Sequence, residues 1–289
     1  MKILLVNDDG YKADSLRRLA VALSTDFDVT VVAPVSNCSG FSNAITINKP
    51  VNIYPLEKNE QLVPVNSQKS ILGFKLKGTP VDCAYIGLNT LFSEFPPDLV
   101  ISGINEGENL AEDTLYSGTV AGAMEGFLSG IPSIAVSQQI TKKNHHNFLY
   151  SAMLFKKILK KIIDQYQMPE GKRNPFLLNI NIPYFFSRID LPNQVEFTRL
   201  GRRKRSKPPQ RLNFSDETYK SYLIGPHGDP PDFLEAGTDL FVMRKKKISI
   251  TEMTVDLSLR AKIDNGTSLF ENFSLDLTDL VNLDESSDH

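Results

Sequence analysis

Two adjacent aspartates, Asp8 and Asp9, follow the first apolar run of this 289-residue chain. The opening sequence MKILLVNDDG predicts a buried strand at residues 3–6, which puts both carboxylates at its C-terminal tip. Two carboxylates this close repel each other in a cleft of low dielectric constant unless a cation lies against them. Mg²⁺ or Mn²⁺ is the simplest cation for this position. Aspartate also favours turns and helix starts, so the pair alone leaves a purely structural role open.

Oxygen-bearing side chains also follow later predicted strands. The loop at 34–43 is rich in Ser, Asn and Gly and includes Ser39 and Asn43, although an ordinary surface loop has the same composition. The strand at 98–104 is followed by Asn105, whose amide oxygen is placed to be a neutral metal ligand. In an open parallel sheet, ligands bind beyond the carboxyl ends of the strands, so we expect these groups to share one site.

A candidate anion site lies further along the chain. Residues 116–122, YSGTVAG, run into a helix of small residues, and a helix N-terminus presents free backbone N–H groups and a positive dipole end. A serine N-cap with close helix packing would give the same pattern. A hard cation beside such a pocket hydrolyses phosphate esters, because it polarises the phosphoryl oxygens and activates a water. Our candidates for binding the substrate phosphate are Asn43, Ser117, Gly118 and Thr119.

The composition is that of a globular protein without a global charge field. Hydrophobic residues make up 41% and charged residues 23% of the chain, and the formal net charge is −2. Because this balance does not gather nucleic acid, we expect small-molecule substrates and no specific nucleic-acid partner. We expect Cys38 and Cys83 to be free thiols. No apolar run reaches the length of a membrane span, so we expect a cytoplasmic protein with no membrane partner.

The elements that must position these groups alternate between strands and helices. Apolar runs of strand length and segments of helical period follow one another through the first half of the chain, which predicts βαβ units. Four such units indicate an α/β fold with a doubly wound, Rossmann-like, mostly parallel sheet. The predicted strands are 3–6, 29–33, 45–53, 71–76, 98–104, 134–136 and 176–182, and the predicted helices are 15–24, 81–91, 118–128 and 147–165.

We predict three regions along the chain. Residues 1–184 form the Rossmann-like core that carries the active site. Residues 185–265 form a β-hairpin and oligomerisation extension that packs on the core and on a partner subunit, and residues 266–289 form an acidic tail. The segments of the extension that predict β-hairpins are 219–224, 240–243 and 248–253.

Several long motifs of the sequence match one family. They are ILLVNDDGY (3–11), VVAP (31–34), SG (39–40), SN (42–43), GTPVDC (78–83), PDLVISGIN (97–105) and YSGTVA (116–121). On these motifs the chain resembles the SurE survival-protein family of 5′/3′-nucleotidases. The resemblance is strong over residues 1–138 and patchier beyond them.

The resemblance implies a site, an activity and an assembly. Asp8, Asp9, Ser39 and Asn105 match the family's metal ligands position by position, and the two aspartates are our candidates for the catalytic residues. The resemblance implies one Mg²⁺ or Mn²⁺ per subunit, nucleoside 5′- and 3′-monophosphates as substrates, and an exopolyphosphatase activity on short polyphosphate. It also implies a cytoplasmic homodimer or homotetramer joined through an exchanged C-terminal extension.

Three departures from the family pattern affect substrate preference and loop mobility more than the type of reaction. Asp14-Ser15 follows Ala13 where the family usually has Pro-Gly, and Leu110-Ala111 follows Asn109 where it usually has Gly. The basic run at 202–207 continues into a segment that does not align well. This run is either a contact for RNA or polyphosphate or, more commonly for such runs, a solvated loop.

Three other classes of function are compatible with parts of the pattern. A nicotinamide-dependent oxidoreductase would need a G-x-G-x-x-G turn after the first strand, where this chain has Asn-Asp-Asp-Gly. A phosphatase with an aspartyl-phosphate intermediate usually spaces its aspartates as Asp-x-Asp. A metal-dependent nucleotide-binding protein without turnover would carry the same residues, so the sequence leaves that alternative open.

Overall fold

The computed structural model describes residues 1–57, 60, 71–141, 148–166, 175–212, 220–225 and 228–256. By its internal contacts the chain divides into two compact units, Met1–Met253 and Thr254–His289. The predicted acidic tail at 266–289 lies outside the described residues. The fold below is that of the first unit.

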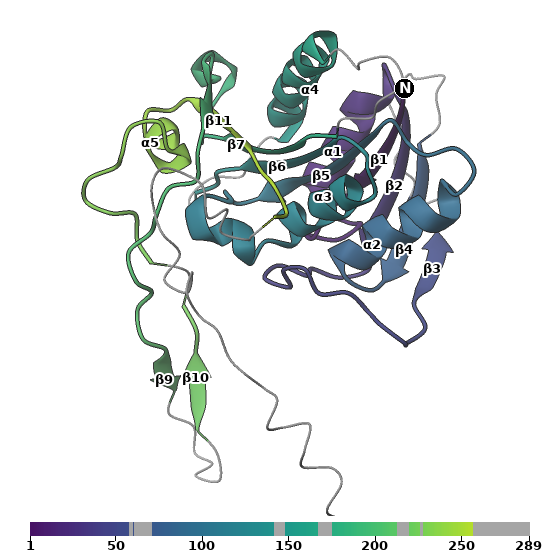
Figure 1. Ribbon diagram of the computed structural model, residues 1–289, viewed down its shortest axis with the longest axis horizontal. Coiled ribbons are helices and arrows are strands. Elements are labelled where there is room, and N and C mark those ends of the chain that lie inside the picture. The colour runs from purple at the N-terminus through teal and green to yellow at the C-terminus, as the bar shows by residue number, and fades with distance from the viewer. Residues whose placement is uncertain are drawn as a thin grey trace, which may run out of the picture. The chain divides into compact units, whose positions relative to one another are not determined.

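A nine-stranded sheet forms the centre of this unit, in the order β3-β4-β2-β1-β5-β6-β7-β11-β8 (Figure 1). The strands from β4 to β7 pair in parallel, whereas β3 and β11 run antiparallel to β4 and β7. The predicted α/β fold with a doubly wound, mostly parallel sheet is therefore confirmed. The sheet strands are β1 (Lys2–Val6), β2 (Asp28–Pro34), β3 (Asn52–Pro55), β4 (Leu72–Lys77), β5 (Leu99–Glu106), β6 (Ser133–Gln138), β7 (Leu177–Ile182), β8 (Val195–Thr198) and β11 (Ile248–Glu252).

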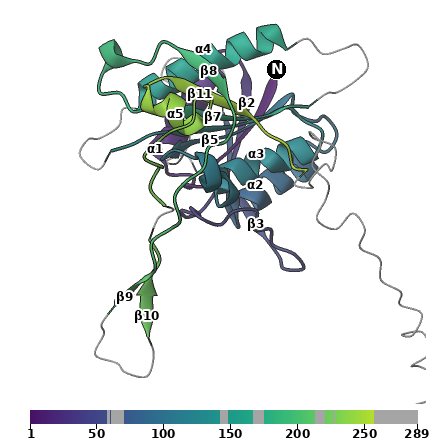
Figure 2. The ribbon, with the colours of Figure 1, turned by 60° about the vertical axis from the view of Figure 1, so that its left-hand side comes forward.

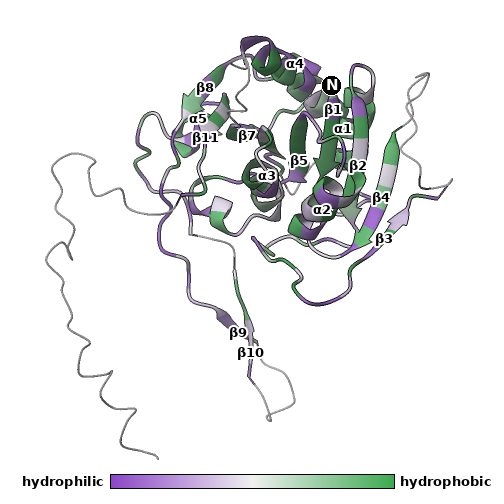
Figure 3. Cartoon of the chain, turned by 45° about the vertical axis from the view of Figure 1, so that its right-hand side comes forward, coloured by the Kyte–Doolittle hydropathy of each residue, from purple (hydrophilic) through white to green (hydrophobic). Residues whose placement is uncertain are grey.

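Helices cover both faces of this sheet (Figure 2). Successive side chains of a strand point to opposite faces, and β1 follows this rule. Ile3 and Leu5 belong to the cluster that packs against α1 (Asp14–Ser24) and α4 (Phe148–Gln165). Leu4 and Val6 belong to the cluster that includes α2 (Pro80–Ile86). The central strands β1 and β5 are accordingly hydrophobic along most of their length (Figure 3).

Helix α3 (Gly118–Leu128) has the bounds that the sequence predicts. Ser117 caps it, because its Oγ accepts a hydrogen bond of 3.0 Å from the backbone N–H of Val120. One side of the helix carries Gly118, Gly122 and Gly126, four residues apart. A methyl group at these positions would lie 2.9 Å from the Asp8 Cβ, 3.0 Å from the Ser102 Oγ and 2.6 Å from the Val100 Cγ2, respectively. Because these residues have no side chain, the backbone of α3 packs closely against the carboxyl end of β1 and along β5.

Two sequence predictions about local structure are wrong. The segment 45–53 is a strand only from Asn52 onward, in β3. The segment 240–243, predicted as a strand, is part of a helix, α5 (Asp239–Arg244), whose N-cap Thr238 accepts a hydrogen bond from the Phe241 N–H. The helix predicted at 81–91 is α-helical over α2 and continues as a π-helix at Gly87–Leu91.

The segment after residue 184 contributes to two sheets. Strands β8 and β11 pair in parallel with each other at the end of the main sheet. Strands β9 (Gln210–Leu212) and β10 (Ser221–Leu223) pair antiparallel as a separate two-stranded ribbon (Figure 1). Three backbone N–H groups, from Ala111, Gly201 and Leu240, donate to the buried carboxylate of Asp239. This carboxylate ties α5 to the loop after β5. Among the described residues, no helix combines the length and the apolarity that a membrane crossing requires.

Asp26, in the turn between α1 and β2, links α1 to α4. Its carboxylate lies 2.6 Å from the Lys160 Nζ and 3.0 Å from the Lys156 Nζ. These hydrogen bonds hold the pKa of Asp26 well below its ordinary value of 3.8. The carboxylate is partly exposed, so solvent screening limits the stabilisation to about 0.5–1 kcal/mol.

We predict that Asp26→Asn lowers the free energy of unfolding at pH 7, because the folded state then loses a carboxylate that two ammonium groups stabilise. The folded protein holds the pKa of Asp26 below 3.8, the value for the unfolded chain, so the carboxylate stabilises the fold fully at pH values above 3.8. This stabilisation is lost as the pH falls from 3.8 toward the folded pKa. The difference between variant and wild type in urea unfolding should therefore shrink between pH 5 and pH 2.5. Asp164→Asn, at an exposed position of α4, is the control. An equal loss at both ends of this pH range would contradict the prediction.

Candidate active site

The loops that carry the predicted site residues meet at the carboxyl edge of the sheet. Strand β1 lies between β2 and β5, so the loops that follow these three strands are neighbours. The N-terminus of α3 approaches the same edge, because Gly118 lies against Asp8. This is the edge at which open α/β sheets bind ligands.

Asp8 is almost fully buried and is held at three points. The Thr119 hydroxyl donates to its Oδ1 at 2.5 Å, and the Cys38 N–H donates to its backbone carbonyl at 2.7 Å. Gly118 leaves no room for the side chain to move toward α3. Burial raises the pKa of the Asp8 carboxyl, and the hydrogen bonds from Thr119 oppose that rise.

Asp9 is partly exposed and faces the loops after β2 and β5. The Glu106 N–H donates to its Oδ2 at 3.1 Å, and the Asn37 Nδ2 approaches its Oδ1 at 3.4 Å. Burial and the neighbouring Asp8 charge raise the pKa of Asp9 to about 7. None of the ion pairs between described residues includes either aspartate. The pair therefore has no protein cation against it in the part of the chain that the structure describes.

The other two predicted ligands, Asn105 and Ser39, come from the end of β5 and from the loop after β2, the two segments that contact Asp9. The Asn105 Nδ2 donates to the Gly107 carbonyl at 2.8 Å, which leaves its Oδ1 as the atom that can coordinate a cation. The pairing of β5 with β6 shifts register between Ser102 and Asn105, so the end of β5 departs from the regular pleat. Ser39 is exposed, and its N–H donates to the Asn37 Oδ1 at 2.8 Å.

Asn37 is a site residue that the sequence analysis missed. Its side-chain amide joins two predicted ligands, because one end contacts Asp9 and the other accepts from Ser39. The only sequence signal was its place in the polar loop after β2, two residues before Ser39. An amide that bridges two loops is recognisable only once both loops are in place.

The predicted phosphate-binding residues have different surroundings. The Ser117 Oγ caps α3 and the Thr119 hydroxyl contacts Asp8, so both side chains serve the local structure. The N–H groups of the first turn of a helix lack partners within the helix, and this turn begins at Gly118. Asn43 is exposed, and its neighbour Ser42 donates to the Leu115 carbonyl at 2.6 Å, which ties the loop after β2 to the approach of α3.

The donor set fits a hard divalent cation. Carboxylate and amide oxygens are the ligands that Mg²⁺ and Mn²⁺ prefer, and Mg²⁺ usually binds to one or two carboxylates and keeps several waters. Among the described residues, no group of three or more His, Cys, Asp or Glu side chains is placed to hold a metal ion. A cation here would therefore complete its coordination with the neutral oxygens of Ser39 and Asn105 and with water.

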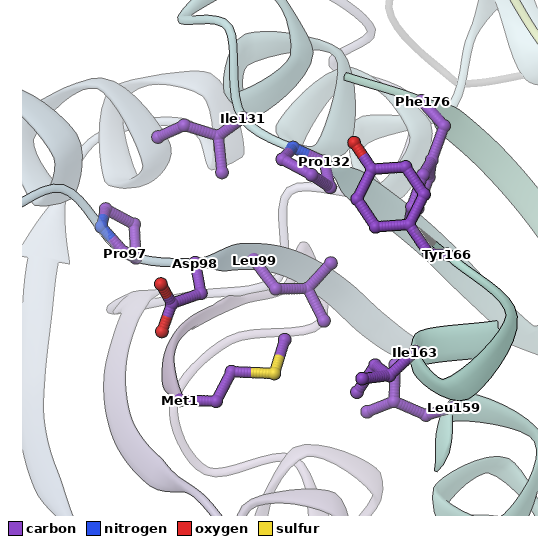
Figure 4. A pocket seen from close by; sticks show the side chains of 10 residues that line it. All are labelled: Met1, Pro97, Asp98, Leu99, Ile131, Pro132, Leu159, Ile163, Tyr166 and Phe176. Carbon is purple, nitrogen blue, oxygen red and sulfur yellow. The ribbon is translucent and has the colours of Figure 1, made fainter. Parts of the chain in front are cut away.

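A cavity lies at the amino edge of the sheet, opposite the edge that carries the predicted site residues. It has a volume of about 410 Å³ and a mainly apolar lining that includes Leu99, Leu159 and Phe176 (Figure 4). Leu99 begins β5, so this cavity is at the amino edge, away from Asp9. None of the predicted site residues is among the described residues that line it.

Residues 3–207 match the family model described as Survival protein SurE. The chain belongs to the SurE family. A SurE relative from Nitrosomonas eutropha, named 5′-nucleotidase SurE, is 39% identical over 263 residues, which cover 89% of this chain and 94% of the relative. A relative of the same name from Halorhodospira halophila is 37% identical over 268 residues, with 91% and 96% covered. The crystal structure of the SurE protein from Aquifex aeolicus matches with a TM-score of 0.69 and 34% identity, over 89% of this chain and 95% of that one.

We predict that Thr119→Val destabilises this SurE protein more than Thr119→Ser does. Valine has nearly the shape of threonine but removes the hydroxyl that donates to the Asp8 Oδ1, and a buried acceptor that loses its donor costs about 1–3 kcal/mol. Serine keeps the hydroxyl and loses only a methyl group. Urea unfolding at pH 7 with a chelator present measures both variants. A serine variant that is as unstable as the valine variant would show that the methyl group, and not the hydroxyl, matters at this position.

Proposed function

We propose that this chain is a metal-dependent phosphomonoesterase that hydrolyses nucleoside 5′- and 3′-monophosphates to nucleoside and phosphate. The observation that carries the proposal is the pair of carboxylates, Asp8 and Asp9, which forms no ion pair with any described residue and of which Asp8 lies against the start of α3. A cation at the aspartates and the positive end of the helix would together bind a phosphate group. The two relatives named 5′-nucleotidase SurE support a nucleotide as the substrate.

We assign one divalent cation per subunit, Mg²⁺ or Mn²⁺, to Asp8, Asp9, Ser39 and Asn105. Such a cation polarises phosphoryl oxygens and lowers the pKa of water from about 15.7 toward neutrality. The fit of these four residues to a hard cation supports the assignment, because each offers an oxygen and Asp9 is in contact with the loops that carry the other two.

The protein's own groups position the reactants. The N–H groups at the start of α3 bind the phosphoryl oxygens, and we assign Ser117 and Asn43 to the same phosphate site; Ser117 is the N-cap of α3, and Ser42, next to Asn43, donates to the Leu115 carbonyl. Thr119 orients Asp8 through its hydroxyl. Asp9 is the more exposed carboxylate, so we assign to it the transfer of a proton from the attacking water.

The same proposal covers the remaining features of the enzyme. Short polyphosphate also ends in a phosphate group that the start of α3 can bind, so we include it among the substrates. A homodimer or homotetramer is supported by the two-stranded β9–β10 ribbon, because an isolated ribbon of this kind gains stability by packing on another surface. A cytoplasmic location is supported by Cys38 and Cys83, which are both free thiols.

We predict that the wild-type protein releases phosphate from 5′-AMP, 3′-AMP and p-nitrophenyl phosphate with Mg²⁺ or Mn²⁺ and not with a chelator. Asp9→Asn should lower kcat by about 10²–10⁴-fold, because the amide cannot accept the proton and holds a cation weakly. The asparagine oxygen can still accept from the Glu106 N–H, so the fold should persist.

Asp14→Asn is the matched control, because Asp14 is an exposed residue of the neighbouring α1 that pairs with Arg18. It should keep wild-type turnover. Release that survives in Asp9→Asn would remove Asp9 from the site. No release from wild type with either metal, together with metal-dependent binding of AMP, would identify a nucleotide-binding protein without turnover.

A further inference from the structure

A pocket of about 570 Å³ opens at the carboxyl edge of β5 and β6, next to the candidate active site. Glu106 contacts Asp9 through its backbone N–H, and Glu108, two residues later, lines the pocket. Two peptide units separate their Cα atoms by about 7.6 Å at most. The pocket therefore begins close enough to Asp9 for one small molecule to occupy both.

The floor of the pocket is apolar and well packed. Leu110, Leu234, Leu240 and Met243 form one buried cluster, and each of them also lines the pocket. The pocket is within the range of about 300–1,000 Å³ that is typical of small-molecule sites, which combine apolar walls with a few polar groups. A flat, weakly polar ring system would bury its faces on this floor.

The rim of the pocket carries charged groups that can form hydrogen bonds. Arg244 and Lys246 are exposed, and no ion pair between described residues includes either of them. The Lys246 Nζ lies 5.6 Å from the centre of the Tyr184 ring, a contact that leaves its N–H groups able to donate to a ligand. Glu108 adds a carboxylate acceptor, 3.5 Å from the Gln139 Nε2.

We propose that this pocket binds the base of the nucleotide while the phosphate lies at Asp8 and Asp9; the inference rests on the function proposed above. A nucleobase offers ring nitrogens and carbonyl oxygens that accept hydrogen bonds, and amino groups that donate them. Arg244 and Lys246 supply the donors, and Glu108 supplies an acceptor. A phosphate chain is the alternative ligand, but the apolar floor gives it nothing to bind and the Glu108 carboxylate repels it.

The test compares substrates that share a phosphate but differ in the base. 5′-AMP and ribose 5-phosphate are hydrolysed with Mn²⁺ by wild type and by the double variant Arg244→Ala/Lys246→Ala. Lys245→Ala is the matched control, because this exposed lysine lies between the two in sequence, does not line the pocket and stacks on Phe241. Thermal unfolding checks that all three proteins are folded.

Removing the two donors should raise KM for 5′-AMP about tenfold more than KM for ribose 5-phosphate, whereas Lys245→Ala should leave their ratio at the wild-type value. Equal rises for both substrates would overturn the inference, since the cations would then act on the phosphate. KM values that stay at wild-type level for both substrates would overturn it as well.

Adenosine binding, measured by calorimetry with a chelator present, tests the pocket without catalysis. Wild type should bind adenosine, and the double variant should bind it about tenfold more weakly. Binding of inorganic tripolyphosphate in place of adenosine would overturn the inference in favour of a phosphate chain. If wild type released no phosphate from any substrate but still bound adenosine in this way, the proposed function would fail and the base pocket would stand.

Discussion

The central constraint in this molecule is the repulsion between two adjacent carboxylates at the tip of a buried strand. Asp8 and Asp9 follow β1, which lies between β2 and β5 and has hydrophobic cores on both of its faces. Both carboxylates are held in place, because Asp8 is enclosed by α3 and the Glu106 N–H at the end of β5 donates to Asp9. The Coulomb energy of such a pair is large at low dielectric constant, and neighbouring groups supply a hydrogen-bond donor to each carboxylate.

The sequence predicted helices and strands correctly where the apolar periodicity and the helix-capping residues indicated the same element. YSGTVAG placed the start of α3 correctly, because a serine N-cap followed by small residues has few other structural meanings. It failed for α5, because the run LFVM is too short to distinguish a helix from a strand by apolar content. The N-cap Thr238 was the better signal there. Strand β3 begins later than predicted, since the apolar alternation from residue 45 pairs with no described strand before Asn52.

For the site, the sequence identified side chains but not the contacts between them. Asp8, Asp9 and Asn105 were recognisable because each follows a predicted strand directly. The bridging role of Asn37 depends on two loops meeting, and the hydrogen bond of Thr119 depends on a helix packing across the sheet. Neither contact can be predicted from the spacing of nearby residues in the sequence. The hydroxyl of Thr119, a residue that stays a predicted phosphate ligand, donates to Asp8 in the structure.

The glycine face of α3 also limits how this active site can change. A side chain at Gly118, Gly122 or Gly126 would push the helix away from the sheet, and would move the N–H groups that we propose bind the phosphate away from the aspartates. The distance between the start of α3 and the aspartates therefore cannot be changed gradually by single substitutions at these glycines. Changes in substrate preference, whether natural or designed, are confined to the surrounding loops and to α5. The helix and the strands beneath it keep the distance between the start of α3 and the aspartates fixed.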